Sequence, residues 1–421
     1  MNISKMMIDV VASMKPILIK IFPKEMLQKA KRKWLSKNME QLRKANIEPY
    51  NKKRFPEGIN LIGNIKGSSG LGQSARLLAY ELESTKYPID IVQHSISNKL
   101  NISDTTYDEK LVNKGRYGIN IFHINMHEFA TAYTQLGKEK WDEHYNIGFW
   151  LWELEVFPDD WVDCINLLDE IWTPAEFVSE SIRKKTNKPV VTIPYHVTAP
   201  VKEEYDRAYF GLPTDQFLYL MLFDSGSMIE RKNPMAVIDA YKKAFKGDEN
   251  VGLVIKMNGY NEKDVTYLNS LLEGYSNIHI ITESFSKLEV NSLIRAVDVV
   301  VSLHRAEGFG LVLAEAMLNE TPCIATNWSA NTEFMNDDVA CMVGYKMARI
   351  EKEIGPYIPG NYWAEANTDE AAFYMKKLYE EPDYYEEKKK KAKKYIDEKL
   401  ALKNISNIIE TRIGKIQDDY E

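Results

Sequence analysis

The segment from Val299 to Met317 constrains the fold more than any other part of this sequence. A short β-branched stretch ends in a polar turn, and an apolar helical stretch follows a Gly-x-Gly corner that opens with Glu307. Glycines let backbone N–H groups approach a ligand closely, and the N-terminus of a helix favours negative charge. The pattern therefore predicts a strand–loop–helix unit that can bind an anionic ligand.

A second carboxylate, Glu315, follows Glu307 in this segment and lies about five residues, or roughly 7 Å, into the predicted helix. That offset suits a ligand with phosphates at the helix N-terminus and a polyhydroxyl group further along, which is the shape of a nucleotide diphosphate sugar. We predict that both glutamates contact such a ligand together with Gly308, Phe309 and Gly310. The alternative is a solvated glutamate beside an ordinary βα turn.

Strand-like and helical segments alternate in two series along the chain, which predicts an α/β protein with mainly parallel sheets. At 421 residues the chain also exceeds one typical hydrophobic core. We predict a basic amphipathic helical extension, an N-terminal Rossmann-like domain, a C-terminal Rossmann-like domain and C-terminal helices that cross back to the N-terminal domain. Their ranges are 1–55, 56–200, 201–385 and 386–421.

The charge is distributed unevenly, because residues 1–54 carry +10 and the rest of the chain carries −17. Such local basic charge argues against a general nucleic-acid-binding protein. In residues 1–44 apolar side chains are interleaved with lysines, a composition that suits helices lying on an anionic membrane surface. The alternative is a basic extension that packs on the acidic body of the protein itself.

The composition is that of a soluble globular protein. No run reaches the roughly 18 apolar residues that span a bilayer, and charged residues interrupt the apolar stretch Met1–Pro23, so no signal peptide is expected. Cys164, Cys323 and Cys341 are widely spaced and odd in number, which fits reduced thiols in the cytosol. We predict a cytoplasmic protein, peripheral at the inner face of the cell membrane if residues 1–54 bind lipid.

A glycine-rich loop, residues 67–75, follows the first predicted strand and precedes a helix expected from Gln73. Gly70 and Gly72 are the candidates for close approach to a ligand. The glycine spacing is not that of a dinucleotide-binding fingerprint, and the second strand ends at His94 rather than at an acidic residue. A nicotinamide-dependent enzyme is therefore disfavoured.

Two adjacent cations, Arg231 and Lys232, stand between a predicted strand and the helix that starts at Pro234. Cations at such a corner can hold a doubly charged diphosphate. The alternative is a basic turn that caps the helix. No Asp-x-Asp stands at a strand end and no cluster has metal-ligand spacing, so a divalent metal is not implied.

An aromatic segment, Phe149–Trp161, ends a strand of the first series and contains Trp152 and Glu153. It suits a surface that binds a sugar or a lipid-linked acceptor, because pyranose faces stack on aromatic rings. The equally weighted alternative is a set of core aromatics. His123 and His127 end another strand, and each fits a structural histidine better than a residue of a binding cleft.

Together these motifs resemble the retaining glycosyltransferases of family 4, which have the GT-B fold of two Rossmann-like domains facing a cleft. Glu307 and Glu315 match the family's Glu-x7-Glu motif, and the segment 231–234 resembles its phosphate-binding lysine segment. The loop at Gly70–Gly72 resembles its N-terminal glycine loop, and the segments 150–161 and 169–174 look like a branch that builds bacterial surface polysaccharides. The resemblance covers roughly residues 58–400.

The resemblance implies transfer of a sugar from a nucleotide diphosphate to a glycan or lipid-linked acceptor, with retained anomeric configuration and no metal or other cofactor. Lys232, Arg231 and the backbone of Gly308–Gly310 would stabilise the leaving diphosphate. Glu307 would hold sugar hydroxyls, Glu315 the ribose hydroxyls, and His127 and Trp152 would lie on the acceptor side.

Two positions depart from the family pattern. Many members have an Arg six residues before the lysine, where this chain has Gly226, so Arg231 and Ser227 are the candidates to replace it. Many also have an active-site His where this chain has Trp152 and Glu153, and Glu153 is expected to face the acceptor. A nucleotide-sugar epimerase or hydrolase and a non-catalytic assembly subunit of the same fold remain as alternatives.

Overall fold

Two compact units make up the computed structural model, which describes residues 24–96, 104–259, 262–272 and 274–420. Within these ranges the first unit comprises residues up to 151, 156–196 and 402 onward, and the second comprises 152–155 and 197–401. The segment expected as carboxyl-terminal helices is divided between the units, because α12 (Pro382–Lys399) belongs to the second and α13 (Leu402–Asp419) to the first.

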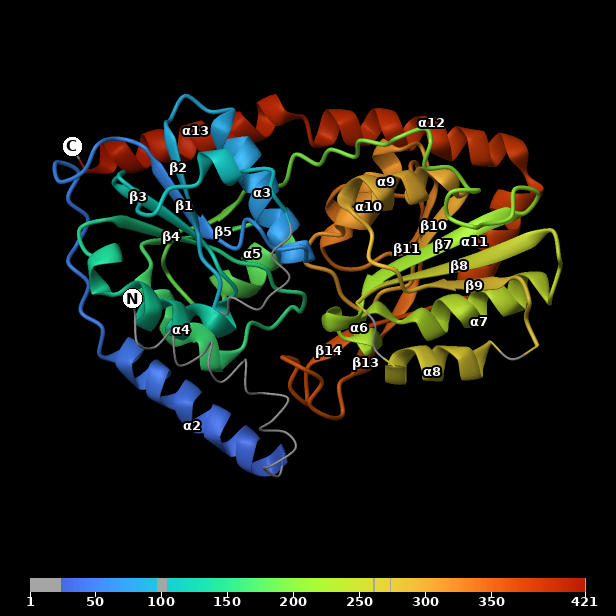
Figure 1. Ribbon diagram of the computed structural model, residues 1–421, viewed down its shortest axis with the longest axis horizontal. Helices are drawn as coiled ribbons and strands as arrows, with labels where there is room; N and C mark the ends of the chain where they lie inside the picture. Colours follow the sequence, from blue (N-terminus) through green and yellow to red (C-terminus); the bar gives the residue numbers. More distant parts are fainter. Residues whose placement is uncertain (1–23, 97–103, 260–261, 273, 421) are drawn as a thin grey trace. The chain divides into compact units, whose positions relative to one another are not determined.

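A parallel six-stranded sheet in the order β2-β1-β3-β4-β5-β6 forms the centre of the first unit. Its helices α3 and α5 follow β1 and β5 as crossovers, and α13 packs against α3 (Figure 1). Near-continuous burial of the strands agrees with a sheet covered on both faces. The strands are β1 (Ile59–Gly63), β2 (Ile89–Gln93), β3 (Ile119–His123), β4 (Tyr145–Phe149), β5 (Glu170–Thr173) and β6 (Val190–Thr192), and the helices α2 (Lys24–Arg43), α3 (Gly70–Glu83), α4 (Met126–Leu136), α5 (Glu176–Arg183) and α13 (Leu402–Asp419).

The described part of the basic extension, α2, packs on the first unit. It contacts α4 and the 3₁₀ turn Asp159–Leu167. Leu42 is buried, Asn38 donates a hydrogen bond to the Thr131 hydroxyl (3.3 Å), and Arg43 pairs with Asp163 (2.7 Å). The helix α2 therefore packs on other elements of its own unit, which does not test membrane binding, and residues 1–23 lie outside the described residues.

The second unit is built on another parallel six-stranded sheet, in the order β12-β11-β10-β7-β8-β9. An antiparallel hairpin, β13 with β14, follows the last of these strands. The strands are β7 (Phe217–Asp224), β8 (Val251–Asn258), β9 (Ile278–Ile281), β10 (Val299–Ser302), β11 (Cys323–Thr326), β12 (Cys341–Val343), β13 (Tyr345–Arg349) and β14 (Tyr362–Ala366). The helices are α6 (Ile229–Lys232), α7 (Pro234–Phe245), α8 (Glu262–Leu271), α9 (Lys287–Ala296), α10 (Leu311–Leu318), α11 (Thr368–Glu380) and α12 (Pro382–Lys399).

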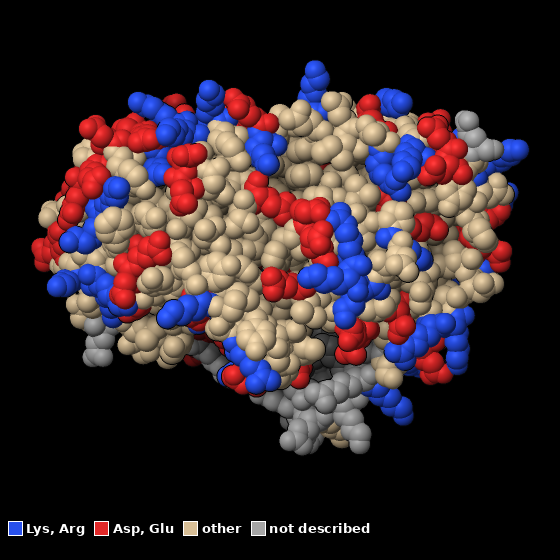
Figure 2. Space-filling view, turned by 180° about the vertical axis from the view of Figure 1, so that it is seen from behind, with Lys and Arg blue, Asp and Glu red and all other residues tan. Residues whose placement is uncertain are grey.

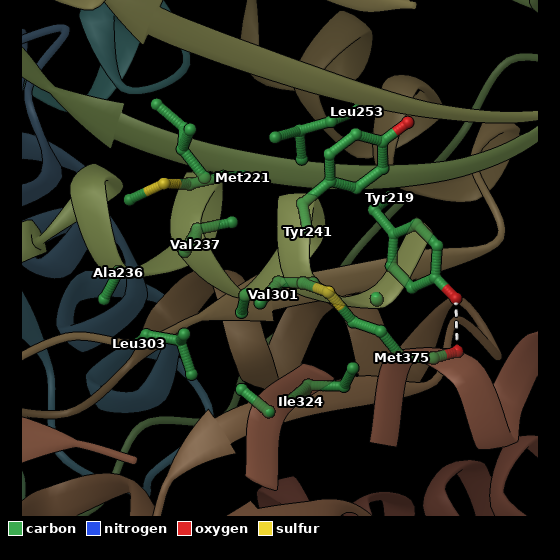
Figure 3. Packing of buried hydrophobic residues seen from close by; sticks show 14 of the residues in the cluster. Tyr219, Met221, Ala236, Val237, Tyr241, Leu253, Val301, Leu303, Ile324 and Met375 are labelled. Carbon is green, nitrogen blue, oxygen red and sulfur yellow. Dashed lines mark hydrogen bonds between the residues drawn. The ribbon is translucent and has the colours of Figure 1, made fainter. Parts of the chain in front are cut away.

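The core of this unit lies between its sheet and the helices α7 and α11 (Figure 3). Tyr219 on β7 points toward α11, where its hydroxyl donates a hydrogen bond to the carbonyl of Met375 (2.6 Å). Tyr241 on α7 likewise donates from its hydroxyl to the carbonyl of Val251 (2.7 Å). Each buried tyrosine thus satisfies its polar atom, so that it adds apolar contact without leaving an unpaired hydroxyl.

Sheet order decides where a ligand can bind in such a unit. In each sheet the strand order reverses beside the first strand of the unit, at β1 and β3 in the first and at β7 and β10 in the second. Loops that leave the carboxyl ends of the strands at this switch point diverge, and ligands bind between them. In the second unit these are the loops that carry Arg231, Lys232 and Glu307.

Candidate functional site

Hydrogen bonds from the backbone of Arg305 and from the side chain of Arg231 join the two switch-point loops of the second unit. The Arg305 N–H donates to the carbonyl of Arg231 (2.8 Å), and the Arg231 guanidinium donates to the carbonyl of Ala306 (2.9 Å). Arg231 also donates from Nε to the carbonyl of Ser227 (3.2 Å). Arg231 is thus oriented by carbonyls from both loops, and Ser227 contributes its backbone oxygen to this arrangement.

Glu307 forms a largely buried ion cluster with the two cations. Lys232 Nζ pairs directly with its carboxylate, and Arg231 lies 3.5 Å from the same oxygen. Burial by itself would raise the pKa of Glu307, but the charges of Lys232 and Arg231 outweigh it and hold the pKa at about 2. Glu307 is therefore ionised throughout the physiological range. The structure brings together three residues that the sequence analysis assigned to one binding site, and their contact with a donor stays a prediction.

A buried histidine, His304, lies in the same turn as Glu307 and makes hydrogen bonds to residues around it. Its Nδ1 lies 3.0 Å from the Ser302 hydroxyl and its Nε2 lies 3.1 Å from the Asn331 side-chain oxygen. Burial lowers the pKa of His304 and favours the neutral ring. The Glu307 N–H in turn donates to the Ser329 hydroxyl (3.0 Å). Sequence reasoning missed this support, although His304 stands in the same polar turn.

The corner before α10 brings backbone close to other groups at two glycines. Gly310 has φ of +99°, a conformation that favours glycine. A Cβ on Gly308 would lie 3.2 Å from the carbonyl oxygen of Trp152. The Phe309 ring is buried against Phe334, with ring centroids 5.1 Å apart, and it anchors the loop. Gly308 thus leaves room for the Trp152 backbone and Gly310 adopts a conformation that favours glycine, while their approach to a ligand stays a prediction.

Glu315 lies in α10 as the sequence predicts, and its side chain is 1% exposed. The ammonium of Lys287, the first residue of α9, forms an ion pair with it. Apart from this ion pair, neither carboxylate oxygen of Glu315 has a hydrogen-bond partner within the described residues. Lys287 gave no signal in the sequence, because only the packing of α9 on α10 brings it to this carboxylate.

Glu153 belongs to the second unit, although its neighbours in sequence continue the first. Its carboxylate accepts a hydrogen bond from the hydroxyl of Tyr357 (3.2 Å), a residue between β13 and β14 that the sequence analysis did not single out. Burial and the charge of Glu153 raise the pKa of Tyr357, so the hydroxyl stays a donor. Trp152 is 2% exposed and packs on Tyr357, so its ring offers no free face to an acceptor in this arrangement.

Comparison with known proteins agrees with this architecture. Residues 203–395 match the family described as Glycosyl transferases group 1. No curated protein matches the chain. Among solved structures, HepE from Anabaena in complex with UDP-glucose is similar over 86% of this chain and 100% of its own, at 12% identity and a TM-score of 0.61.

Two further structures show the same fold. Sucrose-phosphate synthase from Thermosynechococcus elongatus matches 86% of this chain and 100% of its own, at 12% identity and a TM-score of 0.63. The pneumococcal O-GlcNAc transferase GtfA in complex with UDP and GlcNAc matches 71% of this chain at 14% identity and a TM-score of 0.52, and the chain spans 57% of its length.

The chain has the GT-B fold. The range that matches the Glycosyl transferases group 1 family, residues 203–395, lies in the second unit and includes Arg231, Lys232, Glu307 and Glu315. The match supports glycosyl transfer as the class of activity.

In the first unit of this GT-B protein, the glycine loop is held by Arg76. Its guanidinium donates to the carbonyls of Ile65 (2.7 Å) and Gly67 (2.8 Å). A Cβ on Gly72 would come within 2.1 Å of the Gly67 carbonyl, whereas one on Gly70 would meet nothing within 4 Å. Gly72 is therefore needed for packing of the loop. Gly70, the first residue of α3, has open space beside it, and its contact with a ligand stays a prediction.

The histidines of the first unit differ from each other. His123 is buried, and its Nε2 lies 2.6 Å from the Ser74 hydroxyl. Burial lowers the pKa of His123 to about 4, which agrees with the structural alternative. His127 is exposed, with its ring 6.0 Å from that of Trp161. Its acceptor role stays a prediction.

Two residues of the aromatic segment belong to the hydrophobic core of the first unit, as the alternative interpretation of this segment predicts. Trp150 and Phe157 are buried and stack on each other, with ring centroids 5.9 Å apart.

Among the described residues no group of His, Cys, Asp or Glu is arranged to hold a metal ion, and no helix is long and apolar enough to cross a membrane. Basic and acidic side chains are interspersed on the face shown in Figure 2, unlike the basic stripe of a nucleic-acid-binding protein.

Proposed function

We propose that this protein is a retaining glycosyltransferase of family 4 that moves a sugar from a nucleotide diphosphate to a glycan or lipid-linked acceptor in surface polysaccharide synthesis. The observation that carries the proposal is the buried cluster of Lys232, Arg231 and Glu307 at the switch point of the second unit. Two cations beside an ionised carboxylate suit a ligand that combines a diphosphate with sugar hydroxyls.

The cluster also suggests how the chemistry proceeds. The barrier lies in breaking the bond between the sugar and the diphosphate, as negative charge develops on the leaving group. Lys232 and Arg231 are already desolvated and oriented, so they can stabilise that charge without reorganisation. The backbone before α10 adds N–H groups at a helix N-terminus.

The two glutamates have separate roles in this proposal. Glu307, which is ionised, accepts hydrogen bonds from hydroxyls of the transferred sugar. Glu315 lies deeper in α10, and both of its oxygens lack hydrogen bonds within the described residues. A ribose diol would supply two donors to that carboxylate, with Lys287 retained as the countercharge.

A panel of nucleotide sugars tests the donor. A bound donor stabilises the protein by mass action, by about 2.7 kcal/mol at a concentration one hundred times its Kd. We expect one nucleotide sugar to raise the thermal unfolding midpoint, and incubation with an acceptor to give a product whose anomeric configuration NMR shows to be retained. Free sugar formed at the same rate without acceptor would instead indicate a hydrolase, and no response to any donor would contradict the proposal.

We further propose that catalysis needs no metal, because Lys232 and Arg231 can balance the charge of the diphosphate. Activity is expected to persist after removal of divalent cations with EDTA. A complete loss that magnesium or manganese restores would overturn this part of the proposal.

The acceptor side involves the basic extension. We propose that residues 1–54 bring the enzyme to the cytoplasmic face of an anionic membrane, where a lipid-linked acceptor is presented. Each Lys near such a surface contributes on the order of 1 kcal/mol, and the contribution falls with salt. Lys5, Lys15 and Lys20 precede α2 in the sequence, and replacing them by Glu should weaken binding to phosphatidylserine vesicles at low salt.

The matched control replaces Lys389, Lys390 and Lys394, which lie on α12, by Glu. This change alters the net charge equally and should leave vesicle binding unchanged. If both triple variants bind vesicles as the unmodified protein does, the extension does not serve as a membrane anchor.

A further inference from the structure

The loop that joins β13 to β14 lies against the short helix α6, whose last two residues are the cations of the candidate site (Figure 1). A Cβ on Gly355 in this loop would lie 2.8 Å from the sulfur of Met228, the residue before α6. The hairpin itself is tied to the second switch-point loop, because Arg305 donates from Nε to the Glu365 carboxylate (2.6 Å). The loop is therefore held beside the cations by contacts at both of its ends.

Tyr357 is the residue of this loop that reaches the candidate site. It is buried, and its ring packs against those of Trp152 and Trp363, at centroid distances of 5.6 and 6.1 Å. The guanidinium of Arg305 lies 5.2 Å from the centre of the Trp363 ring. The Tyr357 hydroxyl donates a hydrogen bond to the carboxylate of Glu153 (3.2 Å). The packed rings fix the direction of this hydroxyl, and the hydroxyl in turn fixes the carboxylate.

Glu153 lies against the turn that carries Glu307. A Cβ on Gly308, the residue after Glu307, would lie 3.7 Å from Cγ of Glu153. Burial lowers the pKa of Lys232, and Glu153 is among the charges that oppose this effect. Burial alone would lower the pKa of Arg231 as well, but surrounding charges that include Glu153 raise it. Glu153 is therefore close enough to both cations to act on a group that they bind.

The two carboxylates of the site differ in how readily they can take a proton. Glu307 is paired with Lys232 and Arg231, which hold its pKa at about 2, so it is a weak base. Glu153 forms no ion pair among the described residues, and its hydrogen-bond donor is the neutral hydroxyl of Tyr357. Its side chain is only partly buried, which leaves room for a ligand. Glu153 is therefore the better candidate for a general base.

The proposed reaction releases a proton that needs a recipient. In a retaining transfer the acceptor hydroxyl approaches the sugar on the face from which the diphosphate departs, so its proton is released beside the cations that hold the diphosphate. We propose that Glu153 is the general base that takes this proton, and that Tyr357 is the residue that positions Glu153. This inference rests on the proposed transferase function and adds to it a proton acceptor and the residue that orients it.

Bonds and charges balance in this step. The acceptor oxygen bonds to the anomeric carbon while its proton passes to the carboxylate of Glu153. The bond from the anomeric carbon to the diphosphate breaks, and its electron pair leaves on the nucleoside diphosphate, which Lys232 and Arg231 stabilise. Glu153 then releases the proton to water. The diphosphate is the competing recipient of the proton, but the two cations reduce the basicity of its oxygens.

Glu153→Gln tests the base in the full-length protein. The amide keeps the size of the side chain and can still accept a hydrogen bond from Tyr357, but it cannot take the proton. The kcat for transfer to a saccharide should fall about 10²–10⁴-fold, the usual contribution of a general base. Donor affinity measured by calorimetry should stay unchanged. Glu351→Gln is the matched control, because Glu351 is an exposed carboxylate in the same loop as Tyr357, and it should change neither value.

A nucleophile without a proton distinguishes a base from a structural residue. Azide attacks the sugar without deprotonation, so Glu153→Ala should be slow with a saccharide acceptor and should form glycosyl azide at least as fast as the unmodified protein. Tyr357→Phe removes only the hydrogen bond that positions Glu153. It should lower kcat with the saccharide by several-fold to about tenfold and leave the rate with azide unchanged.

The outcomes separate this inference from the transferase proposal. Normal kcat in Glu153→Gln, with transfer by the unmodified protein intact, would contradict the inference alone and would assign the proton to the diphosphate. Equally slow reactions of Glu153→Ala with azide and with saccharide would also overturn it, because Glu153 would then have a structural role. An unmodified protein that neither binds a nucleotide sugar nor transfers from it would contradict the proposed function itself.

Discussion

Each unit contains a buried carboxylate that is paired with a cation, but the other partners of the two carboxylates differ. In the first unit Arg412 on α13 donates from Nε to the Glu170 carboxylate (2.7 Å), which also accepts from the Trp172 indole (2.7 Å) and the Tyr145 hydroxyl (3.0 Å). In the second unit Glu307 is held by Lys232 and Arg231. The first carboxylate has several neutral partners beside its cation, whereas the side-chain partners of the second are charged.

The difference shows how a fold separates a structural pair from a binding site. A buried pair that is saturated by hydrogen bonds gains nothing from a ligand, because every oxygen already has its donors. The pair at Glu307 can exchange partners instead, since sugar hydroxyls can take the carboxylate while a diphosphate takes the cations. We therefore expect damage to the first pair to appear as lost stability and damage to the second as lost turnover.

Removing Arg412 should give the largest effect. Arg412→Met leaves the buried carboxylate of Glu170 without its cation, and breaking such a pair costs about 3–5 kcal/mol. Urea unfolding of the full-length protein should show this loss, with donor affinity unchanged at low urea. Arg43→Met, which breaks the exposed pair with Asp163, is the control and should change stability little. If both variants had the same free energy of unfolding, the pair of Glu170 with Arg412 would have no structural role.

Lys232→Met should affect turnover rather than folding. Loss of one preorganised charge at the leaving group typically lowers kcat by about 10²–10³-fold, or about 2.7–4 kcal/mol. Arg231 remains beside Glu307, so the carboxylate keeps a countercharge and circular dichroism should show an intact fold. Lys243→Met, on the neighbouring helix α7, removes an exposed cation and should leave kcat unchanged. Near-normal turnover in Lys232→Met would place the site elsewhere.

A third buried carboxylate, Glu81 on α3, sharpens the comparison because its side chain has no cation among the described residues. It accepts a hydrogen bond from the His196 N–H (2.6 Å), and burial raises its pKa well above 4.5. The folded state then holds this proton more tightly than the unfolded state. The stability that Glu81 contributes is therefore present below the unfolded pKa and is lost as the pH rises.

Glu81→Gln should remove this pH dependence and raise the free energy of unfolding at pH 8 relative to the unmodified protein, by on the order of 1–3 kcal/mol. Thermal unfolding at several pH values checks this. Glu83→Gln on the same helix is the control, because Glu83 pairs with Lys110 at the surface. Glu307 behaves in the opposite way, since its pKa of about 2 means that its contribution persists above the unfolded pKa and is lost only as the pH falls toward 2. Identical pH profiles for Glu81→Gln and the unmodified protein would contradict this account.

The smallest expected effect is that of Tyr357→Phe. The change removes one hydrogen bond to Glu153 and keeps the ring between Trp152 and Trp363, for a cost of about 0.5–1.5 kcal/mol. We expect transfer to a saccharide to slow by several-fold to about tenfold, while donor binding measured by calorimetry stays constant. A change in donor affinity instead would mean that Tyr357 acts on the nucleotide side.

Much of the fold could be predicted from local patterns. The helix α7 begins at Pro234 as the sequence indicates, and both series of alternating strands and helices form the predicted parallel sheets. Apolar runs separated by turn residues leave few other choices. The aromatic segment of the first unit was harder to predict, because the strand β4 ends at Phe149 and the segment does not continue it. The meeting of Glu307 with Lys232 was also predictable, because both follow parallel strands of one series.

What the sequence alone determined about this protein is thus the set of strand–loop–helix corners and their charges. Spacing within one corner, as between Glu307 and Glu315, follows from helix geometry and needs no knowledge of the rest of the chain. Tertiary structure alone decided which distant residues complete each corner. Lys287 reaches Glu315 through the packing of two helices, and Tyr357 reaches Glu153 across some two hundred residues of chain. Such contacts depend on how the elements pack, and the residues that make them carry no local pattern that would reveal it.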